Sequence, residues 1–348
     1  MKKLLDFFLY DIGIDLGTAN TLVVVKGVGQ MLNEPSVVAL NKITGEILAV
    51  GEEARHMIGR TPSHIVSVSP LQDGVIHDFD TTEAMIRYFI KRAYGLVGGV
   101  LRLKRPRVVI GIPSQVTEVE MRAVVDAAKS AGASKVYLIE APMAAAIGAR
   151  VPINQAHGSM VIDIGGGTTD IVVISLGGII VDKSIRVAGN EMDRAILMYV
   201  KKKYNLLIGK AMAEDVKIML GSAGGKGRGG EVEVKGRDLL TGLPKSLKLT
   251  EQEVSEAIVP VLDKILVAAK KALEEAPPEI VADFIDSGVY LTGGGALIRN
   301  VAEYFTKKLK VKVVAVSDPL TSVVRGTELL LDEIELLEKV KIDYDAII

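Results

Sequence analysis

Residues 11–25 have the sequence DIGIDLGTANTLVVV, and residues 160–174 have the similar sequence MVIDIGGGTTDIVVI. In each, an apolar strand leads to an aspartate, Asp15 or Asp163, then to a turn with glycine and threonine, and then to a second apolar strand. Glycine tolerates the backbone angles of tight turns, and the β-branched runs favour buried strands. The two aspartates are 148 positions apart, close to one domain length, so the repeat predicts a duplicated fold.

Strand-like and helix-like segments alternate after each hairpin, which predicts an α/β architecture. Thr117 with Glu120, and Thr250 with Glu253, have the spacing of a capping box, which starts a helix. The second of these helices is expected to reach about Glu275, with a kink or a break at Pro260. Further strands are expected at 107–113, 135–139 and 289–292, and further helices at 142–149 and from about 296.

Composition excludes several classes of protein and site. The chain has 42 basic and 43 acidic residues, so it lacks the basic surplus of a general nucleic-acid binder, and no nucleic acid is expected as a partner. It has no cysteine, which excludes disulfides and thiolate metal sites. No apolar run reaches the ~20 residues that span a bilayer, so we expect a cytoplasmic protein. The glycine-rich stretch 221–230 predicts an exposed loop.

The two glycine turns are candidate phosphate sites, because small side chains let backbone amides approach an anion. Asp15 and Asp163 precede these turns, where Mg²⁺ would offset the repulsion between carboxylate and phosphate. The alternative is a pair of ordinary hairpin turns, but two matched turns at domain spacing favour phosphate binding. The candidate residues are Gly17, Thr18, Ala19 and Asn20 in the first turn and Gly165, Gly166, Gly167 and Thr168 in the second.

Two further segments are candidates for nucleotide contact. Residues 291–299, LTGGGALIR, place three glycines after a strand, where a helix start could accept a phosphate or let a base lie on the backbone. A tight structural turn is the alternative for this motif. Glu214 and Lys217 share one face of a helix, and their spacing alone favours a solvated surface ion pair over contacts to ribose and base.

Several motifs resemble the MreB-type bacterial homologues of actin, over essentially the whole chain. The matching segments are DLGTANT at 15–21, NEPSVVAL at 33–40, PMAAAIGA at 142–149, DIGGGTTD at 163–170, TGLP at 241–244 and LTGGGALIRN at 291–300. Within the superfamily of actin, sugar kinases and heat-shock chaperones, these sequence motifs are specific to MreB-type proteins.

The resemblance implies an actin-like fold of two domains, each with a smaller inserted subdomain, and a nucleotide cleft that holds ATP and Mg²⁺. The expected limits are 1–150 with 326–348 for domain I, whose insertion is about 34–70, and 151–325 for domain II, whose insertion is about 186–255. It also assigns nucleotide contacts to Glu214 and Lys217 and to Gly293, Gly294, Gly295, Ala296 and Leu297.

The resemblance further implies a function. MreB-type proteins polymerise into paired protofilaments under the inner membrane and organise wall synthesis, so the chain itself, the membrane surface and the membrane proteins of cell-wall elongation are the expected partners. A sugar kinase of the same superfamily is the alternative, but no sugar pocket or catalytic aspartate is evident. A chaperone would need a further C-terminal domain.

One position departs from the family pattern. MreB-type proteins usually have two acidic residues before the proline of this helix, and the second positions the attacking water. Here the order is Glu140, Ala141, Pro142. Since alanine cannot orient water, either Glu140 substitutes for it or hydrolysis of ATP is slow or absent. ATP binding should survive the change.

Two segments are candidates for membrane contact. On a helical wheel, an apolar arc in residues 1–10 lies opposite Lys2, Lys3 and Asp6, which suits a short interfacial helix; packing on the protein's own core is the alternative. Residues 95–107 alternate leucine with basic residues, as expected of a loop tip near lipid. The candidate side chains are Leu4, Leu5, Phe7, Phe8, Leu9, Leu101 and Leu103.

Overall fold

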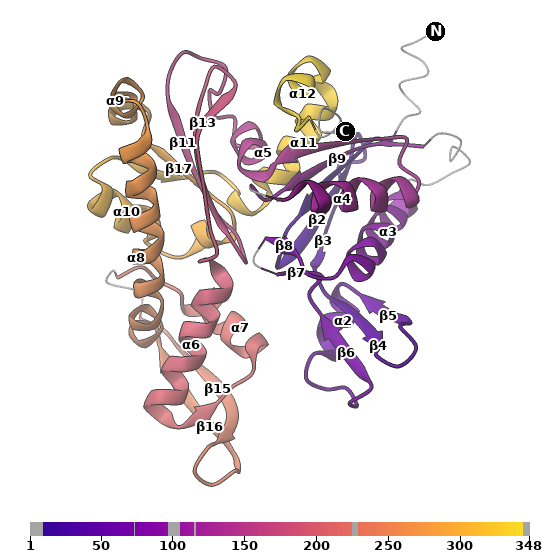
Figure 1. Ribbon diagram of the computed structural model, residues 1–348. Helices are drawn as coiled ribbons and strands as arrows, with labels where there is room; N and C mark the ends of the chain where they lie inside the picture. Colours follow the sequence, from indigo (N-terminus) through magenta and orange to yellow (C-terminus); the bar gives the residue numbers. More distant parts are fainter. Residues whose placement is uncertain (1–9, 73, 97–104, 115, 225–228, 344–348) are drawn as a thin grey trace. The chain divides into compact units, whose positions relative to one another are not determined.

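The computed structural model describes residues 10–72, 74–96, 105–114, 116–224 and 229–343. The chain divides into two compact units (Figure 1). Unit 1 comprises Met1–Gln155, Leu176–Ile179 and Leu320–Ile348, and unit 2 comprises Ala156–Ser175 and Ile180–Pro319. The domain and subdomain limits expected from the resemblance stay a prediction.

Unit 1 is built on a five-stranded sheet with the order β10-β9-β1-β2-β3. Strand β1 pairs antiparallel with β2 and parallel with β9, which in turn pairs parallel with β10. The first hairpin predicted from the sequence is therefore confirmed at the centre of this sheet. The strands are β1 (Ile12–Leu16), β2 (Asn20–Val25), β3 (Met31–Pro35), β9 (Arg107–Ile112) and β10 (Lys135–Glu140).

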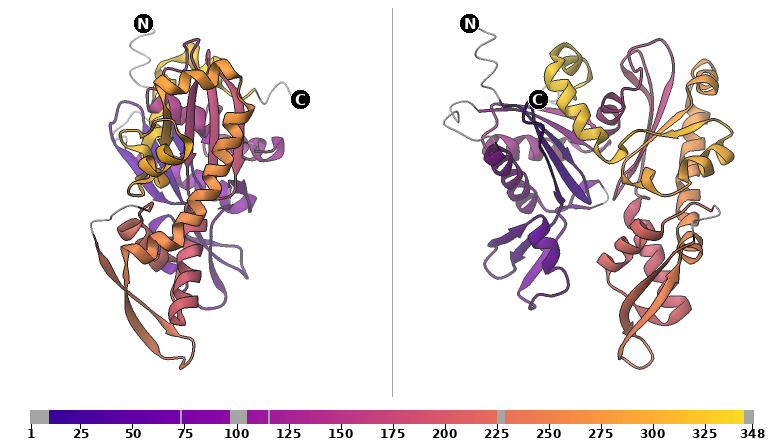
Figure 2. Two further views of the ribbon diagram at one scale, coloured as in Figure 1. Left: turned by 90° about the vertical axis from the view of Figure 1, so that its left-hand side faces the viewer. Right: turned by 180° about the vertical axis from the view of Figure 1, so that it is seen from behind.

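Helices cover both faces of this sheet (Figures 1 and 2). Alternate residues of β1 point to opposite faces: Ile12 and Ile14 pack into the core formed with α3 and α4, whereas a Cβ on Gly13 would lie 2.4 Å from Thr327 Oγ1 of α11. The capping box of Thr117 and Glu120 is confirmed at the start of α4. The helices are α3 (Phe79–Leu96), α4 (Glu118–Ser130), α5 (Ala141–Gly148), α11 (Ser322–Asp332) and α12 (Ile334–Val340).

A smaller sheet of order β5-β4-β6 lies at one end of unit 1, with α2 (Glu52–Met57) against it. Its core is a small cluster of Val37, Ala39 and Ala54. The strands are β4 (Val38–Asn41), β5 (Ile47–Val50) and β6 (Ile65–Val68), and the two-residue strands β7 (Leu71–Gln72) and β8 (Val75–Ile76) follow them. Figure 1 shows this sheet and α12 at opposite ends of unit 1.

Unit 2 repeats the sheet of unit 1 with the order β13-β12-β11-β17-β18. Strand β11 pairs antiparallel with β12 and parallel with β17, as β1 does with β2 and β9. The duplication and the α/β architecture expected from the sequence are thus confirmed. The strands are β11 (Ser159–Ile164), β12 (Thr169–Ser175), β13 (Gly178–Ile185), β17 (Val289–Thr292) and β18 (Val313–Ala315).

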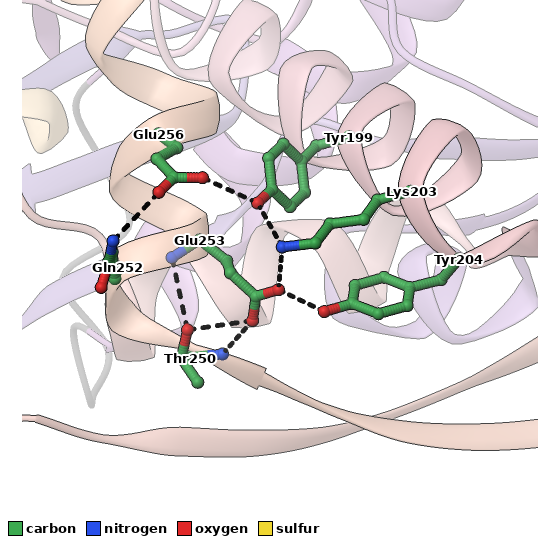
Figure 3. A network of polar contacts seen from close by, with 7 residues as sticks. All are labelled: Tyr199, Lys203, Tyr204, Thr250, Gln252, Glu253 and Glu256. Carbon is green, nitrogen blue, oxygen red and sulfur yellow. Dashed lines mark hydrogen bonds and ion pairs between the residues drawn. The ribbon is translucent and has the colours of Figure 1, made fainter.

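Helices and a second, three-stranded sheet complete unit 2. The helices are α6 (Gly189–Tyr204), α7 (Lys210–Leu220), α8 (Glu251–Glu275), α9 (Pro278–Ser287) and α10 (Val301–Leu309), and the strands of the smaller sheet are β14 (Leu206–Leu207), β15 (Glu231–Asp238) and β16 (Pro244–Thr250). The capping box of Thr250 and Glu253 is confirmed at the start of α8. Glu253 also accepts hydrogen bonds from Lys203 and Tyr204 of α6 (Figure 3).

Two expectations for unit 2 need correction. Helix α8 runs from Glu251 to Glu275 with Pro260 inside it, so a break at Pro260 is absent, whereas the kink expected as the alternative stays a prediction. Buried side chains on both sides of Pro260, including Ile258 and Val261, hold the helix against the core. The glycine-rich stretch is not exposed throughout, because Ser222 and Ala223 are almost fully buried where Ser222 forms a β-bridge with Arg299.

Candidate nucleotide-binding site

The first glycine turn joins β1 to β2 and is supported by Ser36. Ser36 Oγ donates to Gly17 O at 2.6 Å, and Ser36 N donates to Ala19 O at 2.9 Å. In a planar trans peptide the carbonyl and the following amide point in opposite directions, so the amides of Thr18 and Asn20 point away from Ser36. A Cβ on Gly17 would lie 2.5 Å from Asn20 O, so only glycine fits this turn.

The second glycine turn joins β11 to β12 and is supported by the start of α6. Gly165 O accepts a hydrogen bond from Gly189 N at 3.1 Å, and Gly166 O accepts one from Asn190 N at 2.7 Å. By the same peptide geometry, the amides of Gly166 and Gly167 point away from α6. Successive amides directed to one side form a concave anion site, which fits the phosphate role predicted for both turns.

Asp163 is the next-to-last residue of β11 and is buried, 7% exposed, and its Oδ1 has no hydrogen-bond partner among the described residues. Burial raises the pKa of Asp163 to about 6, although the nearby Thr292 hydroxyl acts to lower it. Asp170 lies directly opposite it in the hairpin, and burial raises the pKa of Asp170 to about 7. Two buried carboxyls with an unsatisfied oxygen fit a site that receives a cation or a proton.

Mg²⁺ fits the residues at this site only with help from a ligand. No group of three or more acidic or histidine side chains in the described part of the chain could hold a metal by itself. Mg²⁺ commonly uses one or two carboxylates together with water and substrate phosphates, and the buried Asp163 is such a carboxylate in unit 2. Asp15 is half-buried in unit 1.

The third glycine motif lies beside Asp163 in unit 2. Gly293 has a φ of 77°, and a Cβ there would lie 2.3 Å from Asp163 Oδ1; a Cβ on Gly295 would lie 2.2 Å from Ile164 Cγ2. These glycines therefore let the loop pack against the end of β11. The expectation of a helix from about Ala296 is wrong, because a 3-10 turn, η1 (Gly294–Leu297), comes first and α10 begins at Val301. Leu297 remains 59% exposed.

Lys217 lies on α7 and is not the solvated surface residue that spacing alone favoured. Its Nζ lies 2.9 Å from Asp193 Oδ1 and donates to Gly189 O at 3.2 Å, and its side chain is 15% exposed. Spacing within one helix could not reveal Asp193, because that residue lies on the neighbouring helix α6. Glu214 is half-buried on the same helix as Lys217.

Glu140 is the residue before α5, and Ala141 is the first residue of that helix. Ser114 Oγ donates to Glu140 Oε2 at 3.4 Å. Because β1, β9 and β10 are parallel, Glu140 ends its strand at the same edge of the sheet as Asp15. Glu140 is therefore placed among the site residues of unit 1, whereas Ala141 has no group that could orient water.

The structure thus brings the predicted site residues together in two sets. Unit 1 holds Asp15, Gly17–Asn20 and Glu140, and unit 2 holds Asp163, Gly165–Thr168, Glu214, Lys217 and Gly293–Leu297. Asp170 and Asp193 were missed in the sequence; a second aspartate in DIGGGTTD was the available signal for Asp170.

The predicted membrane residues Leu4, Leu5, Phe7, Phe8, Leu9, Leu101 and Leu103 lie outside the described residues. Among the helices that the structure describes, none has the length and apolar character needed to cross a membrane.

The chain matches the MreB/Mbl protein family over residues 9–339. It is 49% identical over 335 residues to the cell shape-determining protein Mbl of Bacillus subtilis, covering 96% of this chain and 99% of that protein. It is 45% identical to the cell shape-determining protein MreB of Escherichia coli, covering 97% of each chain. The crystal structure of MreB5 of Spiroplasma citri bound to ADP has a TM-score of 0.88 at 38% identity, covering 94% of this chain and 97% of that one.

Proposed function

Because this chain belongs to the MreB/Mbl family, we propose that it is an actin-like cytoskeletal protein that binds ATP, assembles into filaments and helps to determine cell shape. The observation that carries nucleotide binding is the pair of matched glycine turns, each of which directs backbone amides to one open side. Its relative MreB5 was solved with ADP bound. The sugar kinase alternative is not proposed, because the close relatives are cell shape-determining proteins.

In this proposal the amides of both turns bind phosphate oxygens of ATP. Asp163 and Asp15 would be the carboxylates that hold Mg²⁺, which would supply positive charge to offset that of the phosphates. Lys217, Glu214 and the loop 293–297 contact the remainder of the nucleotide.

Calorimetry with ATP and Mg²⁺ tests nucleotide binding. Gly17→Ala should weaken binding strongly, because the added Cβ would lie 2.5 Å from Asn20 O and must deform the turn. Gly95→Ala is the matched control, since a Cβ there meets nothing within 4 Å. If the folded parent protein takes up no adenine nucleotide, the proposed function is wrong.

The groove beside α12 is the surface we propose for head-to-tail assembly. It is a cavity of about 870 Å³ lined by α12, by Asn154 and by the turn Leu176–Gly178. Leu176 has a φ of 53°, which is rare for a bulky residue, and its side chain is 71% exposed. The lining includes apolar Ile334 and acidic Glu335, so it suits an apolar tip with a positive charge nearby.

The turn between β4 and β5 is such a tip. Asn41 Oδ1 accepts a hydrogen bond from Ile43 N at 2.9 Å, which fixes the turn, and the Ile43 side chain is 81% exposed beside Lys42. This tip and the groove belong to the same unit and lie at its opposite ends (Figure 1). A tip at one end and a groove at the other define a heterologous contact, which propagates into a filament.

Cysteine cross-linking tests this contact, because the chain has no cysteine of its own. A chain with Ile43→Cys and Ile334→Cys, oxidised with ATP and Mg²⁺ present, should give a covalent ladder on a non-reducing gel. A chain with Leu240→Cys and Ile334→Cys is the control, since Leu240 is also exposed, at 79%, but lies on the tip in unit 2. Filaments in electron microscopy without the ladder would reject the contact, and absence of filaments would reject assembly itself.

Membrane attachment is a further part of the proposal. The apolar side chains of residues 4–9, with Leu101 and Leu103, enter the headgroup region, and nearby lysines and arginines contact anionic lipid. Filaments held on the inner face of the membrane then organise the membrane proteins of cell-wall elongation. Deletion of residues 2–9 should reduce flotation with anionic liposomes, and unchanged flotation would remove this segment from the proposal.

A further inference from the structure

Asp193 and Lys217 form a half-buried ion pair inside unit 2. Asp193 Oδ2 accepts a hydrogen bond from Lys217 Nζ at 3.0 Å, and Oδ1 lies 2.9 Å from the same nitrogen. The two side chains are only 14% and 15% exposed. Both oxygens of the aspartate therefore face one ammonium, and the pair joins α6 to α7.

The ammonium of Lys217 lies beside the second glycine turn. A Cβ built on Gly189 would be 3.3 Å from Lys217 Nζ, 3.3 Å from Gly165 O and 3.6 Å from Gly166 Cα. Gly189 therefore lies between the charge and the turn, and a side chain there would come close to both. The ammonium lies on the α6 side of the turn, whereas the amides of Gly166 and Gly167 point away from α6. Its charge therefore attracts an anion held by those amides across the thickness of the turn.

Asp193 is what keeps the lysine there. A lysine side chain is long and flexible, and its strongly hydrated ammonium favours solvent unless a partner fixes it. Asp193 stands one helical turn after Gly189, whose amide and carbonyl bond to the glycine turn and to Lys217 respectively. The anchor and the turn are therefore parts of one rigid segment.

The pair is not arranged for stability alone. Burial raises the pKa of Asp193, Lys217 acts to lower it, and the charge of nearby Glu214 raises it further. Partial burial and the nearby carboxylate of Glu214 both disfavour the ionised form of Asp193. Ion pairs of this kind contribute little net stability. The position of Asp193 is better explained by a need to hold Lys217 in place than by a contribution to stability.

We propose that Asp193 is a positioning residue for nucleotide binding: it holds the Lys217 ammonium beside the glycine turn 165–168, and it acts on the nucleotide through Lys217. This inference rests on the proposed function, since it needs ATP to bind in unit 2. In this proposal Asp193 on α6 controls the contact that Lys217 on α7 makes with the nucleotide.

A double-mutant cycle tests the proposal, with the affinity for ATP and Mg²⁺ measured by calorimetry. Asp193→Ala should weaken binding about tenfold, because Lys217 is then free to leave the turn. Asp193→Asn keeps an oxygen acceptor of the same shape and should restore most of the affinity. In a Lys217→Ala background, Asp193→Ala should cause no further loss.

The outcomes separate this inference from the proposed function. If the parent chain binds ATP and Asp193→Ala binds equally tightly, or weakens binding by the same factor without Lys217, Asp193 does not act through Lys217. If the parent chain binds no ATP, the proposed function itself fails. Asp215→Ala, on the exposed side of α7, is the control and should leave the affinity unchanged.

Discussion

Single residues at the candidate site are unfavourable to the folded protein when no ligand is bound. Asp163 is buried with an unsatisfied oxygen, and Asp170 is buried opposite to it. A buried carboxylate without a partner lowers stability, and such groups persist where function needs them. A bound cation such as Mg²⁺ would satisfy a carboxylate of this kind.

Asp163→Asn should therefore stabilise the protein without nucleotide. The folded pKa of Asp163 is about 6, above its usual 3.8, so ionisation costs the folded state stability as pH rises through that window. At pH 8 the variant should be more stable than the parent by about 1–3 kcal/mol, and the difference should disappear near pH 4. Thermal unfolding at both pH values measures this, and a variant less stable at pH 8 would contradict it. The exposed Asp286→Asn is the control.

Glu253 differs from Asp163, because its pKa is lowered and not raised. Burial acts to raise its pKa, but hydrogen bonds from Lys203, Tyr204 and Thr250 outweigh burial and lower the pKa to about 2 (Figure 3). The lowered pKa means that its contribution is present above pH 4.5 and is lost as pH falls towards 2.

Glu253→Gln should lower the free energy of unfolding at pH 7 by about 1–2 kcal/mol, because the cap of α8 loses its charged acceptor. Urea unfolding at pH 7 and at pH 3 measures the loss, which should be smaller at the lower pH. Glu256→Gln, in the exposed part of the same network, should have little effect. Equal losses at both pH values would show that ionisation of Glu253 does not matter.

The alanine at position 141 leads to a prediction about the rate of ATP hydrolysis. Glu140 is held by Ser114, and the next position has no polar group to orient water. Ala141→Glu should raise the rate of phosphate release on the order of 10²-fold, with ATP affinity little changed. A parent chain that already releases phosphate as fast as the variant would show that Glu140 suffices.

At the scale of elements, the closest packing in unit 1 is the crossing of α5 and α11. A Cβ on Gly148 would lie 1.9 Å from Ser322 O, and a Cβ on Gly326 would lie 1.9 Å from Ala144 O. The two helices therefore cross with backbone against backbone. This crossing holds α5, which follows Glu140, in a fixed position on the sheet.

Alanine at either glycine should disrupt this crossing. Gly148→Ala or Gly326→Ala should destabilise unit 1 by about 1–3 kcal/mol, because the new methyl group meets backbone that cannot move aside. Gly95→Ala, in helix α3 with open space around it, should instead be neutral or stabilising by about 0.5–1 kcal/mol. Thermal midpoints of the three variants measure this, and a neutral Gly326→Ala would show that the helices can separate.

At the scale of the whole molecule, two units with the same sheet topology each contribute one glycine turn. If both turns bind phosphate, ATP with Mg²⁺ should slow hydrogen exchange in residues 17–20 and in residues 165–168 together. At about 100 times its dissociation constant, ATP should add about 2.7 kcal/mol to stability. Hydrogen exchange with mass spectrometry measures this, and protection of one turn alone would restrict phosphate binding to that unit.

The sequence by itself determined the two hairpins, their duplication, both capping boxes and the family, because glycine turns, β-branched runs and capping residues act over a few positions. The actin-like fold that the motifs implied is supported by the close match to MreB5. Only the tertiary structure decided that Lys217 pairs with Asp193, that α8 runs through Pro260 and that Gly293 packs on Asp163. These outcomes depend on contacts between segments far apart in the chain, and local sequence patterns carry no record of which distant side chain or backbone will lie opposite.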